Sequence, residues 1–367
     1  MEDRAKRKVR IPRKDAFFGF HHDAHSRDES IEKGTDVTEE MVERLIRETK
    51  PDYIQYDGKH GSGNVSFHTK IGWTFPGLKK DQLAIFRKVT AHHNIPLLIE
   101  WMGLSDGKAA ELHPDWVSVD AEGKPYTRPV MSTFSPYDEE IAIPQAKEAI
   151  DAYDLYGFWI DCDVFSARLD WSERAQKAFT AATGIKEIPR KPGDPHWHEW
   201  MVFHRRQYIE HVKRVFTALR AHKHGFQPII IGLYNSYCNP EPIDAATTVD
   251  YLGSDVPSSG RYHGDARCLR FESRYLASTG VLWDLEPWGT ELGENCEYSV
   301  VHVCDLMQEA AIVISQGGGF QIDYGVVGPI VPGPSFAGWW DDWIIRIIAE
   351  VGRFCRARQA VSHRSVT

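Results

Sequence analysis

The stretch YGFWIDCDVF, residues 156–165, begins as an apolar strand and then places two acids, Asp161 and Asp163, directly after it. Its central residues FWI show no alternation of polar and apolar side chains, which is typical of a strand covered on both faces in a parallel sheet. The carboxyl ends of parallel strands form the edge at which such folds bind ligands. The two acids are therefore predicted to lie at a binding edge.

Other segments of the chain repeat this pattern. The predicted strands are residues 16–23, 51–59, 95–102, 156–163, 228–235, 248–255, 280–288 and 318–325. Helical patterns occupy residues 36–50, 78–94, 137–154, 203–223, 265–279, 299–316 and 339–359, and the weakest helix is expected between the fifth and sixth strands, at residues 236–247. Asp36, with Glu39 three residues later, has the spacing of a capping box and is the predicted N-cap of the first helix.

Alternation of strands and helices eight times indicates an α/β protein of the (β/α)8 TIM barrel type with a single catalytic domain. The predicted barrel covers residues 16–359, after a basic N-terminal extension at 1–15 and before a C-terminal tail at 360–367. Two long insertions, residues 103–135 and 172–200, follow the third and fourth strands. Because both begin at the carboxyl end of a strand, they are expected to form walls above the barrel mouth.

The composition narrows the class of partner. The 367 residues carry a formal net charge of −9, which argues against nucleic acid or an acidic membrane surface as partner. No apolar segment follows the basic N-terminus, and no apolar run reaches membrane-spanning length, so a cytoplasmic location is expected. The six cysteines form no C-x-x-C pair, which favours free thiols over disulfides. The oligomeric state stays open.

Polar and aromatic side chains gather where the predicted strands end. The ring consists of His21, His22, Asp23, Asp57, Lys59, His60, Glu100, Trp101, Asp161, Asp163, Asn235, Asp255, Glu286 and Asp323. Asparagine and aspartate also favour helix caps, so each residue alone is a weak signal. Together they indicate a site rich in carboxylate and imidazole groups.

Such a ring fits glycoside hydrolysis, which needs one protonated and one ionised carboxyl group on either side of the bond that breaks. Asp161 follows a well-packed strand end and is the predicted nucleophile. The opposing acid is Glu286 or Asp255. Glu286 is preferred because its neighbours Trp283, Pro287 and Trp288 provide an apolar environment that keeps a proton on a carboxyl group.

The other ring residues are candidate contacts for a sugar. Donors to its hydroxyl groups are His21 or His22, together with Lys59 and His60; Asp57, Glu100, Asp163, Asn235 and Asp323 are further substrate-binding candidates, and Trp101 and Trp288 are candidates for stacking on a sugar ring. No metal ion or other cofactor is expected. The expected partner is a small glycoside or an oligosaccharide.

Three motifs carry a family resemblance. FFGFHHDAH at 17–25, YIQYDGKHGSG at 53–63 and GFWIDCD at 157–163 resemble the catalytic barrel of α-L-fucosidases of glycoside hydrolase family 29 and a related group of hypothetical glycosyl hydrolases. The resemblance implies that a strand-one histidine, Lys59 and His60 hold the sugar and that Asp161 is the nucleophile of a retaining enzyme. The second motif has one histidine where the family has two, and Cys162 replaces a glycine.

Two other classes of function remain open. HHDAH at 21–25 together with Asp323 is similar to the metal ligands of amidohydrolases, but that site also needs histidines at the fifth and sixth strands, where this chain has Asn235 and Asp255. A barrel that binds sugars without cleaving them is the third class. Zinc analysis and turnover of aryl glycosides distinguish these alternatives.

Overall fold

The computed structural model describes residues 15–23, 32–35, 37–161, 168–231, 251–256, 266–292, 298–324, 335–336 and 342–362. Residues 1–14 and 363–367, most of the predicted extension and tail, lie outside the described residues. Asp163, Asn235 and the helix expected between the fifth and sixth strands also lie outside them. No helix of the described chain is long and apolar enough to span a membrane.

Eight strands of the described chain form a closed ring of parallel pairs, in the order β1, β14, β11, β9, β8, β7, β6, β3 and back to β1. They are β1 Phe18–His22, β3 Tyr53–Lys59, β6 Leu97–Met102, β7 Gly157–Asp161, β8 Gln227–Ile231, β9 Tyr251–Gly253, β11 Leu282–Pro287 and β14 Gly319–Asp323. Each coincides with a predicted strand. The (β/α)8 barrel is therefore confirmed.

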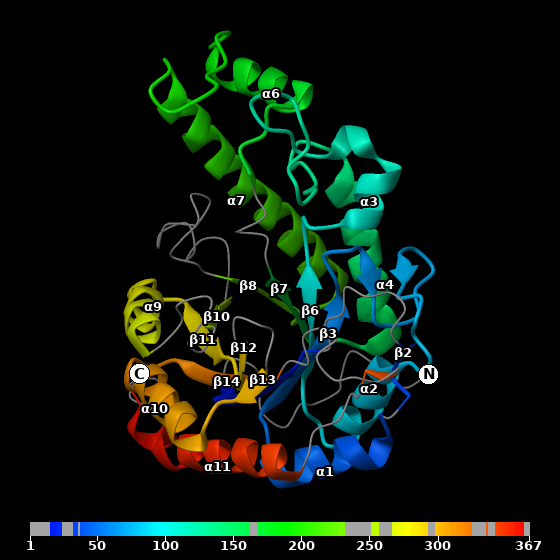
Figure 1. Cartoon of the computed structure of the whole chain (residues 1–367), viewed down its shortest axis with the longest axis vertical. Coiled ribbons are helices and arrows are strands. Elements are labelled where there is room, and N and C mark those ends of the chain that lie inside the picture. The colour runs from blue at the N-terminus through cyan, green and yellow to red at the C-terminus, as the bar shows by residue number, and fades with distance from the viewer. Residues whose placement is uncertain are drawn as a thin grey trace.

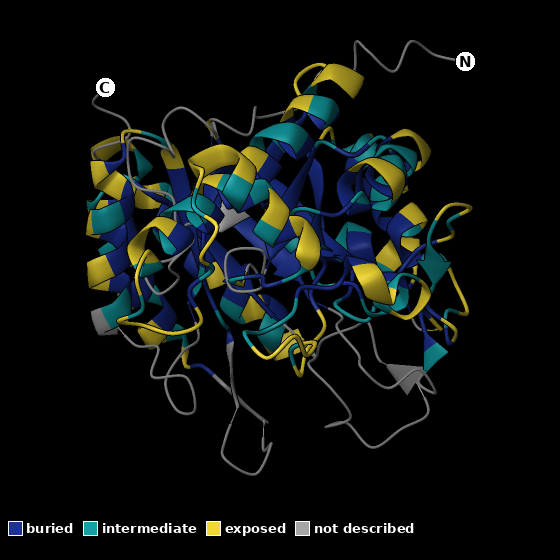
Figure 2. Ribbon diagram, turned by 90° about the horizontal axis from the view of Figure 1, so that it is seen from above, coloured by how far each residue is buried: buried dark blue, intermediate teal, exposed yellow. Residues whose placement is uncertain are grey.

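Helices surround this ring on its outer side (Figure 1). They are α1 Glu39–Thr49, α2 Gln82–His92, α4 Ile143–Tyr153, α7 Trp197–His222, α9 Ala266–Ser278, α10 Val303–Ser315 and α11 Asp342–Arg358. Most strand residues that face outward are apolar and nearly inaccessible, and they meet the buried stripes of the helices. In Figure 2 the dark interior is enclosed by helices with exposed outer faces. This is the layer of apolar packing that the uninterrupted strand pattern predicted.

The first helix corrects one local prediction. The N-cap of α1 is Thr38, whose side chain accepts a hydrogen bond from the Met41 backbone N–H at 3.3 Å. Asp36 was the predicted cap, but the helix begins two residues later than that spacing implies. Threonine also suits this position, because its hydroxyl oxygen accepts a hydrogen bond from the backbone N–H three residues later, which has no partner within the helix.

Further elements lie between or after the barrel strands and their helices. They are β2 Glu32–Lys33, β4 Asn64–Val65, β5 Trp73–Thr74, α3 Gly107–Leu112, η3 Pro114–Trp116, η4 Asp138–Ala142, α6 Glu173–Thr183, β10 Asp255–Val256, β12 Thr290–Leu292, β13 Tyr298–Val300, β15 Ser335–Phe336 and η5 Gln359–Val361. Among them β10 has a direct bearing on the site, because it pairs in parallel with the end of β11.

The two long insertions pack together beyond the barrel. Figure 1 shows α6 and the first turns of α7 at the far end of the molecule's long axis. A second hydrophobic cluster holds them, built around Trp171, Phe179 and Trp200. Asp170 joins the insertions, because its carboxylate accepts hydrogen bonds from the Val119 N–H at 3.1 Å and from the Ser132 hydroxyl at 2.5 Å. The insertions thus form one wall that rises from the ends of β6 and β7.

Candidate active site

The interior of the barrel holds a cluster of polar side chains at the carboxyl ends of the strands. Along each strand, alternate residues point to opposite faces, so the polar residues near the strand ends face inward while their apolar neighbours face the helices. The cluster consists of His21, Gln55, Glu100, Asp161, Asp255, Glu286, Gln321 and Asp323, and the accessible fraction of all but Asp255 is at most 9%. Side chains from this many strands can meet only inside the barrel.

His21 lies at the centre of this cluster. Its Nδ1 hydrogen-bonds the Glu286 carboxylate and lies 3.2 Å from the Gln55 amide, while its Nε2 forms an ion pair of 3.4 Å with Glu100. Burial lowers the pKa of the imidazole, but the charge of Glu286 and the contacts to Glu100 outweigh that effect and raise the pKa well above its usual value. His21 is therefore the cation that balances part of the surrounding negative charge.

A second inward layer lies beneath the cluster. The Tyr53 hydroxyl donates a 2.7 Å hydrogen bond to Asp284, and the Trp159 ring lies with its centroid 6.2 Å from that of His21. Gly253 makes room for this layer, because a Cβ atom there would lie 2.7 Å from the Trp159 indole nitrogen and 3.1 Å from an Asp284 carboxylate oxygen. The floor of the site is thus an indole ring and a tyrosine held by a buried carboxylate.

Asp255 and Glu286 stand side by side at the edge of the cluster. They are register partners on the parallel strands β10 and β11. Burial and the negative charges of Asp161 and Glu286 raise the pKa of Asp255 to about 8, against a smaller opposing effect of hydrogen bonds that include the Trp288 side chain. Asp255 therefore holds its proton at neutral pH.

Glu286 differs from Asp255 in its partners. Its carboxylate is hydrogen-bonded by the His21 imidazole and by the Gln321 side-chain amide. Burial raises its pKa, whereas the charge and the hydrogen bond of His21 lower it, and the net direction is upward. Two of the apolar neighbours that favoured Glu286 as the acid, Trp283 and Pro287, face the opposite side of the strand, and Trp283 packs at Gly318.

Asp161 ends β7, where it is the register partner of Met102 on β6. Only 9% of it is accessible. Its negative charge helps to raise the pKa of Asp255, although the two acids come from different strands. The structure thus brings three of the predicted catalytic carboxyl groups to one end of the barrel.

Lys59 and Trp101 are among the predicted sugar contacts that lie outside this cluster. Lys59 is fully buried, and its Nζ lies 2.6 Å from Asp106 and donates a 2.7 Å hydrogen bond to the Tyr137 hydroxyl. Trp101 stacks on Phe158 with an interplanar angle of 1° and a centroid distance of 4.8 Å, on the helix-facing side of the strands. Both side chains secure the wall rather than line the inward-facing cluster.

Of the two candidate histidines on β1, His21 faces inward and His22 faces outward. His22 packs against Tyr56 and against Phe86 of α2, two rings that also contact each other, and burial lowers its pKa to about 3. His22 is therefore a neutral member of the layer between strands and helices.

Asp57 and His60 belong to a separate buried group at the end of β3. The Ser66 hydroxyl donates a 2.6 Å hydrogen bond to Asp57, and His60 Nε2 lies 3.2 Å from the same carboxylate. Lys33 Nζ, from β2, lies 3.3 Å from Asp57 and 3.1 Å from His60. This group ties the loop after β1 to the loop after β3.

Sequence reasoning missed Gln55, Trp159 and Gln321 in the cluster and its floor. Each lies on the inward face of its strand, two residues before a residue that was predicted: Asp57, Asp161 and Asp323. The two-residue period of a strand was the signal that could have found them.

Among the described residues, His21, Glu286 and Asp323 form a group that could hold a metal ion, with ligand atoms that all lie within 4.8 Å of one another. The buried Oδ1 of Asp323 has no hydrogen-bond partner in the described part of the chain. A metal would have to displace the proton of His21, because imidazole binds metals only in its neutral form. The high pKa of His21 disfavours that exchange.

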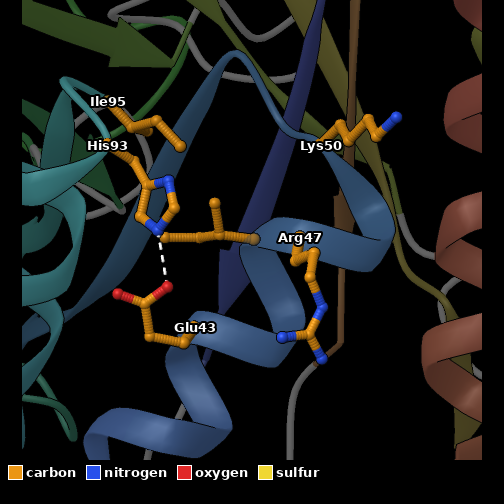
Figure 3. A pocket seen from close by; sticks show the side chains of 6 residues that line it. Glu43, Arg47, Lys50, His93 and Ile95 are labelled. Carbon is orange, nitrogen blue, oxygen red and sulfur yellow. Dashed lines mark hydrogen bonds and ion pairs between the residues drawn. The ribbon is translucent and has the colours of Figure 1, made fainter.

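A surface groove elsewhere on the molecule has no part in this site. Figure 3 shows its lining residues, among which Glu43 and His93 form an ion pair of 2.6 Å. Lys50 and Ile95 also line it, and they lead into the beginnings of β3 and β6. The groove therefore lies at the end of the barrel opposite the polar cluster.

Comparisons with known proteins identify the fold. No family model matches the chain, and no curated protein sequence matches it. Among solved structures, α-L-fucosidase isoenzyme 2 from Paenibacillus thiaminolyticus superimposes with a TM-score of 0.75 at 20% identity, over 95% of this chain and 50% of that protein.

Two further structures superimpose over most of the chain. The α-L-fucosidase from Vibrio sp. strain EJY3 gives a TM-score of 0.58 at 13% identity, over 95% of this chain and 55% of its own length. The β-galactosidase from Bacillus circulans sp. alkalophilus gives 0.66 at 13% identity, over 96% and 57%. This chain spans about half the length of these proteins. The resemblance to fucosidases is confirmed at the level of the barrel fold.

Proposed function

We propose that the protein is a glycoside hydrolase. The observation that carries the proposal is the meeting of Asp161, Asp255 and Glu286 at the carboxyl end of one barrel, where the pKa of Asp255 is raised to about 8 by burial and by the other two acids. A site that keeps one carboxyl group protonated beside ionised ones has the two forms that glycosidic cleavage requires.

In this proposal Asp255 is the general acid. Its proton passes to the oxygen of the departing group as the glycosidic bond breaks, and Asp161 attacks the anomeric carbon to form a covalent glycosyl ester. Asp255, now ionised, then removes a proton from water, which attacks the same carbon and releases Asp161. The sugar leaves with retained configuration.

Glu286 takes a different role from the one its sequence neighbours favoured. His21 and Gln321 both donate a hydrogen bond to its carboxylate. A carboxylate held in its ionised form by two donors is better suited to accept a hydrogen bond from a sugar hydroxyl than to give up a proton. Its negative charge also keeps the proton on Asp255. His21 and Glu286 thus act together as a binding pair next to the acid.

We infer that the substrate is a small α-L-fucoside or a related sugar. The sequence motifs around Asp161 and the superposition on α-L-fucosidases support this choice. The β-galactosidase with the same barrel makes galactosides the first alternative to test. Trp159 beneath His21 offers an apolar ring on which a sugar face could rest.

The test is turnover of nitrophenyl glycosides by the purified chain. We expect hydrolysis of the α-L-fucoside, loss of that hydrolysis in Asp161→Asn, and initial release of the same anomer when the reaction is followed by proton NMR. Absence of turnover over a panel that includes β-galactosides, together with measurable sugar binding, would instead support a barrel that binds sugars without cleaving them. Initial release of the inverted anomer would contradict the nucleophilic role of Asp161.

A further inference from the structure

Trp288 directly follows β11 and lies on the same face of the sheet as Glu286. Residues two apart on a strand point to the same side, so both side chains project inward. The register partner of Trp288 is Asp323 of β14, just as Glu286 is hydrogen-bonded by Gln321 two residues earlier on both strands. Trp288 is partly exposed, whereas Glu286 and Asp323 are buried. Trp288 therefore lies at the outer rim of the polar cluster.

The backbone of Trp288 is held by the two strands that flank β11. Its N–H donates a 3.1 Å hydrogen bond to the Val256 carbonyl of β10, and the N–H of the next residue, Gly289, donates one of 2.6 Å to the Asp323 carbonyl. The Tyr324 ring packs on Gly289, where a Cβ atom would lie 2.6 Å from a ring carbon. The indole is thus carried by a fixed strand end, which is the kind of element that places a binding group accurately.

The strand order places Trp288 beyond the proposed acid, as seen from the proposed nucleophile. Around the barrel, β7 with Asp161 is followed by β8, by β9 with its continuation β10, and then by β11. Val256, which accepts the hydrogen bond from Trp288, directly follows Asp255 in β10. Nucleophilic attack and departure occur on opposite sides of the anomeric carbon, and the acid contacts the departing oxygen. The departing group is therefore directed past Asp255 toward Trp288.

We propose that Trp288 is a specificity-determining residue for the departing group: its indole is the surface on which a departing sugar ring stacks. The inference rests on the proposed function and on Asp255 as the general acid. A pyranose ring has a face of C–H groups, which packs on an aromatic ring. Trp159 lies beneath His21 at the floor of the site, so the cleaved sugar and the departing sugar each have an indole to contact.

The experiment compares two fucosides whose departing groups differ in size but both need a proton. They are methyl α-L-fucoside and an α-L-fucosyl disaccharide in which galactose is the departing ring. Trp288→Leu removes the aromatic face, and Trp288→Phe keeps a smaller one. Trp343→Leu is the matched control, because Trp343 is an exposed tryptophan on the outer helix α11.

The quantity that reports on Trp288 is the ratio of kcat/KM for the disaccharide to kcat/KM for the methyl fucoside. We expect Trp288→Leu to lower this ratio about three- to tenfold, which corresponds to the loss of one aromatic contact. Trp288→Phe should recover part of the loss, and Trp343→Leu should have the wild-type ratio. A wild-type ratio in Trp288→Leu would overturn the inference.

Transfer to an acceptor by the wild type is a second measurement, which decides the matter if Trp288→Leu does not fold. The glycosyl ester is formed from a nitrophenyl fucoside in the presence of galactose or methanol. A hydroxyl oxygen of the acceptor attacks the anomeric carbon, Asp255 takes its proton, and the bond to Asp161 breaks. We expect more transfer product from galactose than from methanol at equal concentration. Equal or lower transfer to galactose would contradict a sugar-binding surface at Trp288.

The two measurements separate the failure of this inference from the failure of the proposed function. If the wild type hydrolyses both fucosides but Trp288→Leu keeps the wild-type ratio, the proposed function stands and Trp288 has no part in recognising the departing ring. If the wild type hydrolyses no glycoside, the proposed function is wrong and the inference fails with it.

Discussion

Asp255 and Glu286 are direct register partners on the parallel strands β10 and β11, so their side chains project from neighbouring strands on the same side of the sheet. Their environments separate them. His21 provides a cation and a hydrogen bond to Glu286, while the side chains that act most strongly on Asp255 are the negative charges of Asp161 and Glu286. The contact with His21 therefore favours the ionised form of Glu286, and the neighbouring negative charges favour the protonated form of Asp255.

This pair predicts the basic limb of the pH profile. Asp255 must be protonated to act as an acid, so kcat/KM should fall as the pH rises through about 8. Glu286→Gln removes a charge that raises the pKa of Asp255, and the fall should move to lower pH. Glu173→Gln, an exposed change on α6, should not move it. A basic limb that is the same in Glu286→Gln and the wild type would contradict the assignment.

Asp255→Asn should separate substrates by their leaving groups. The variant cannot donate a proton to the departing oxygen, so the rate on a natural glycoside should drop by about 10²–10⁴. The rate on an activated aryl glycoside should change little, because that leaving group departs without protonation. Steady-state kinetics on both substrates checks this. If Glu286→Gln shows the leaving-group dependence and Asp255→Asn does not, the acid is Glu286.

Lys59 should matter for stability more than for sugar binding. Lys59→Met leaves the carboxylate of Asp106 buried without its cation, and breaking a buried pair costs about 3–5 kcal/mol of unfolding free energy. Urea denaturation measures that loss, and replacing Asp106 by Leu in the same protein should recover part of it. Lys177→Met removes an exposed ion pair and should cost less than about 1 kcal/mol. Unchanged stability with a raised KM would instead indicate that Lys59 binds the sugar.

Chelation should not affect turnover. The proton of His21 and its hydrogen bond to Glu286 occupy the position at which His21, Glu286 and Asp323 would otherwise bind a metal. After dialysis against a chelator, we expect full activity and no stoichiometric zinc by elemental analysis. Loss of activity that zinc restores would favour the metal-dependent hydrolase instead.

The strand positions were predictable because each barrel strand is apolar on the face that meets the helices and turns polar at its end. The side on which a particular residue lies was harder to predict. At β3 the register with β6 shifts between Tyr56 and Lys59, and the sequence YDGK does not predict that irregularity. Gly58 permits it, because a Cβ there would lie 2.3 Å from the Glu100 carbonyl oxygen. Lys59 consequently contacts Asp106 in the wall.

The identity of the acid was open in the sequence for a similar reason. Adjacent residues on a strand face opposite ways, so Trp283 and Pro287 describe the outer surroundings of β11 and not those of the Glu286 carboxyl group. The partners that decide its protonation, His21 and Gln321, come from two other strands. Contacts between strands distant in sequence appear only once the barrel closes.

The central claim is that Asp161 forms a covalent bond to the sugar. A fluorinated glycosyl fluoride of the hydrolysed sugar slows the second step of a retaining enzyme and lets the glycosyl ester accumulate, where mass spectrometry of peptides can locate it. We predict one sugar per chain, attached to Asp161, with loss of activity in proportion to labelling and no label in Asp161→Asn. A label on Glu286, or continued turnover of a natural glycoside without any labelled carboxylate, would contradict the account.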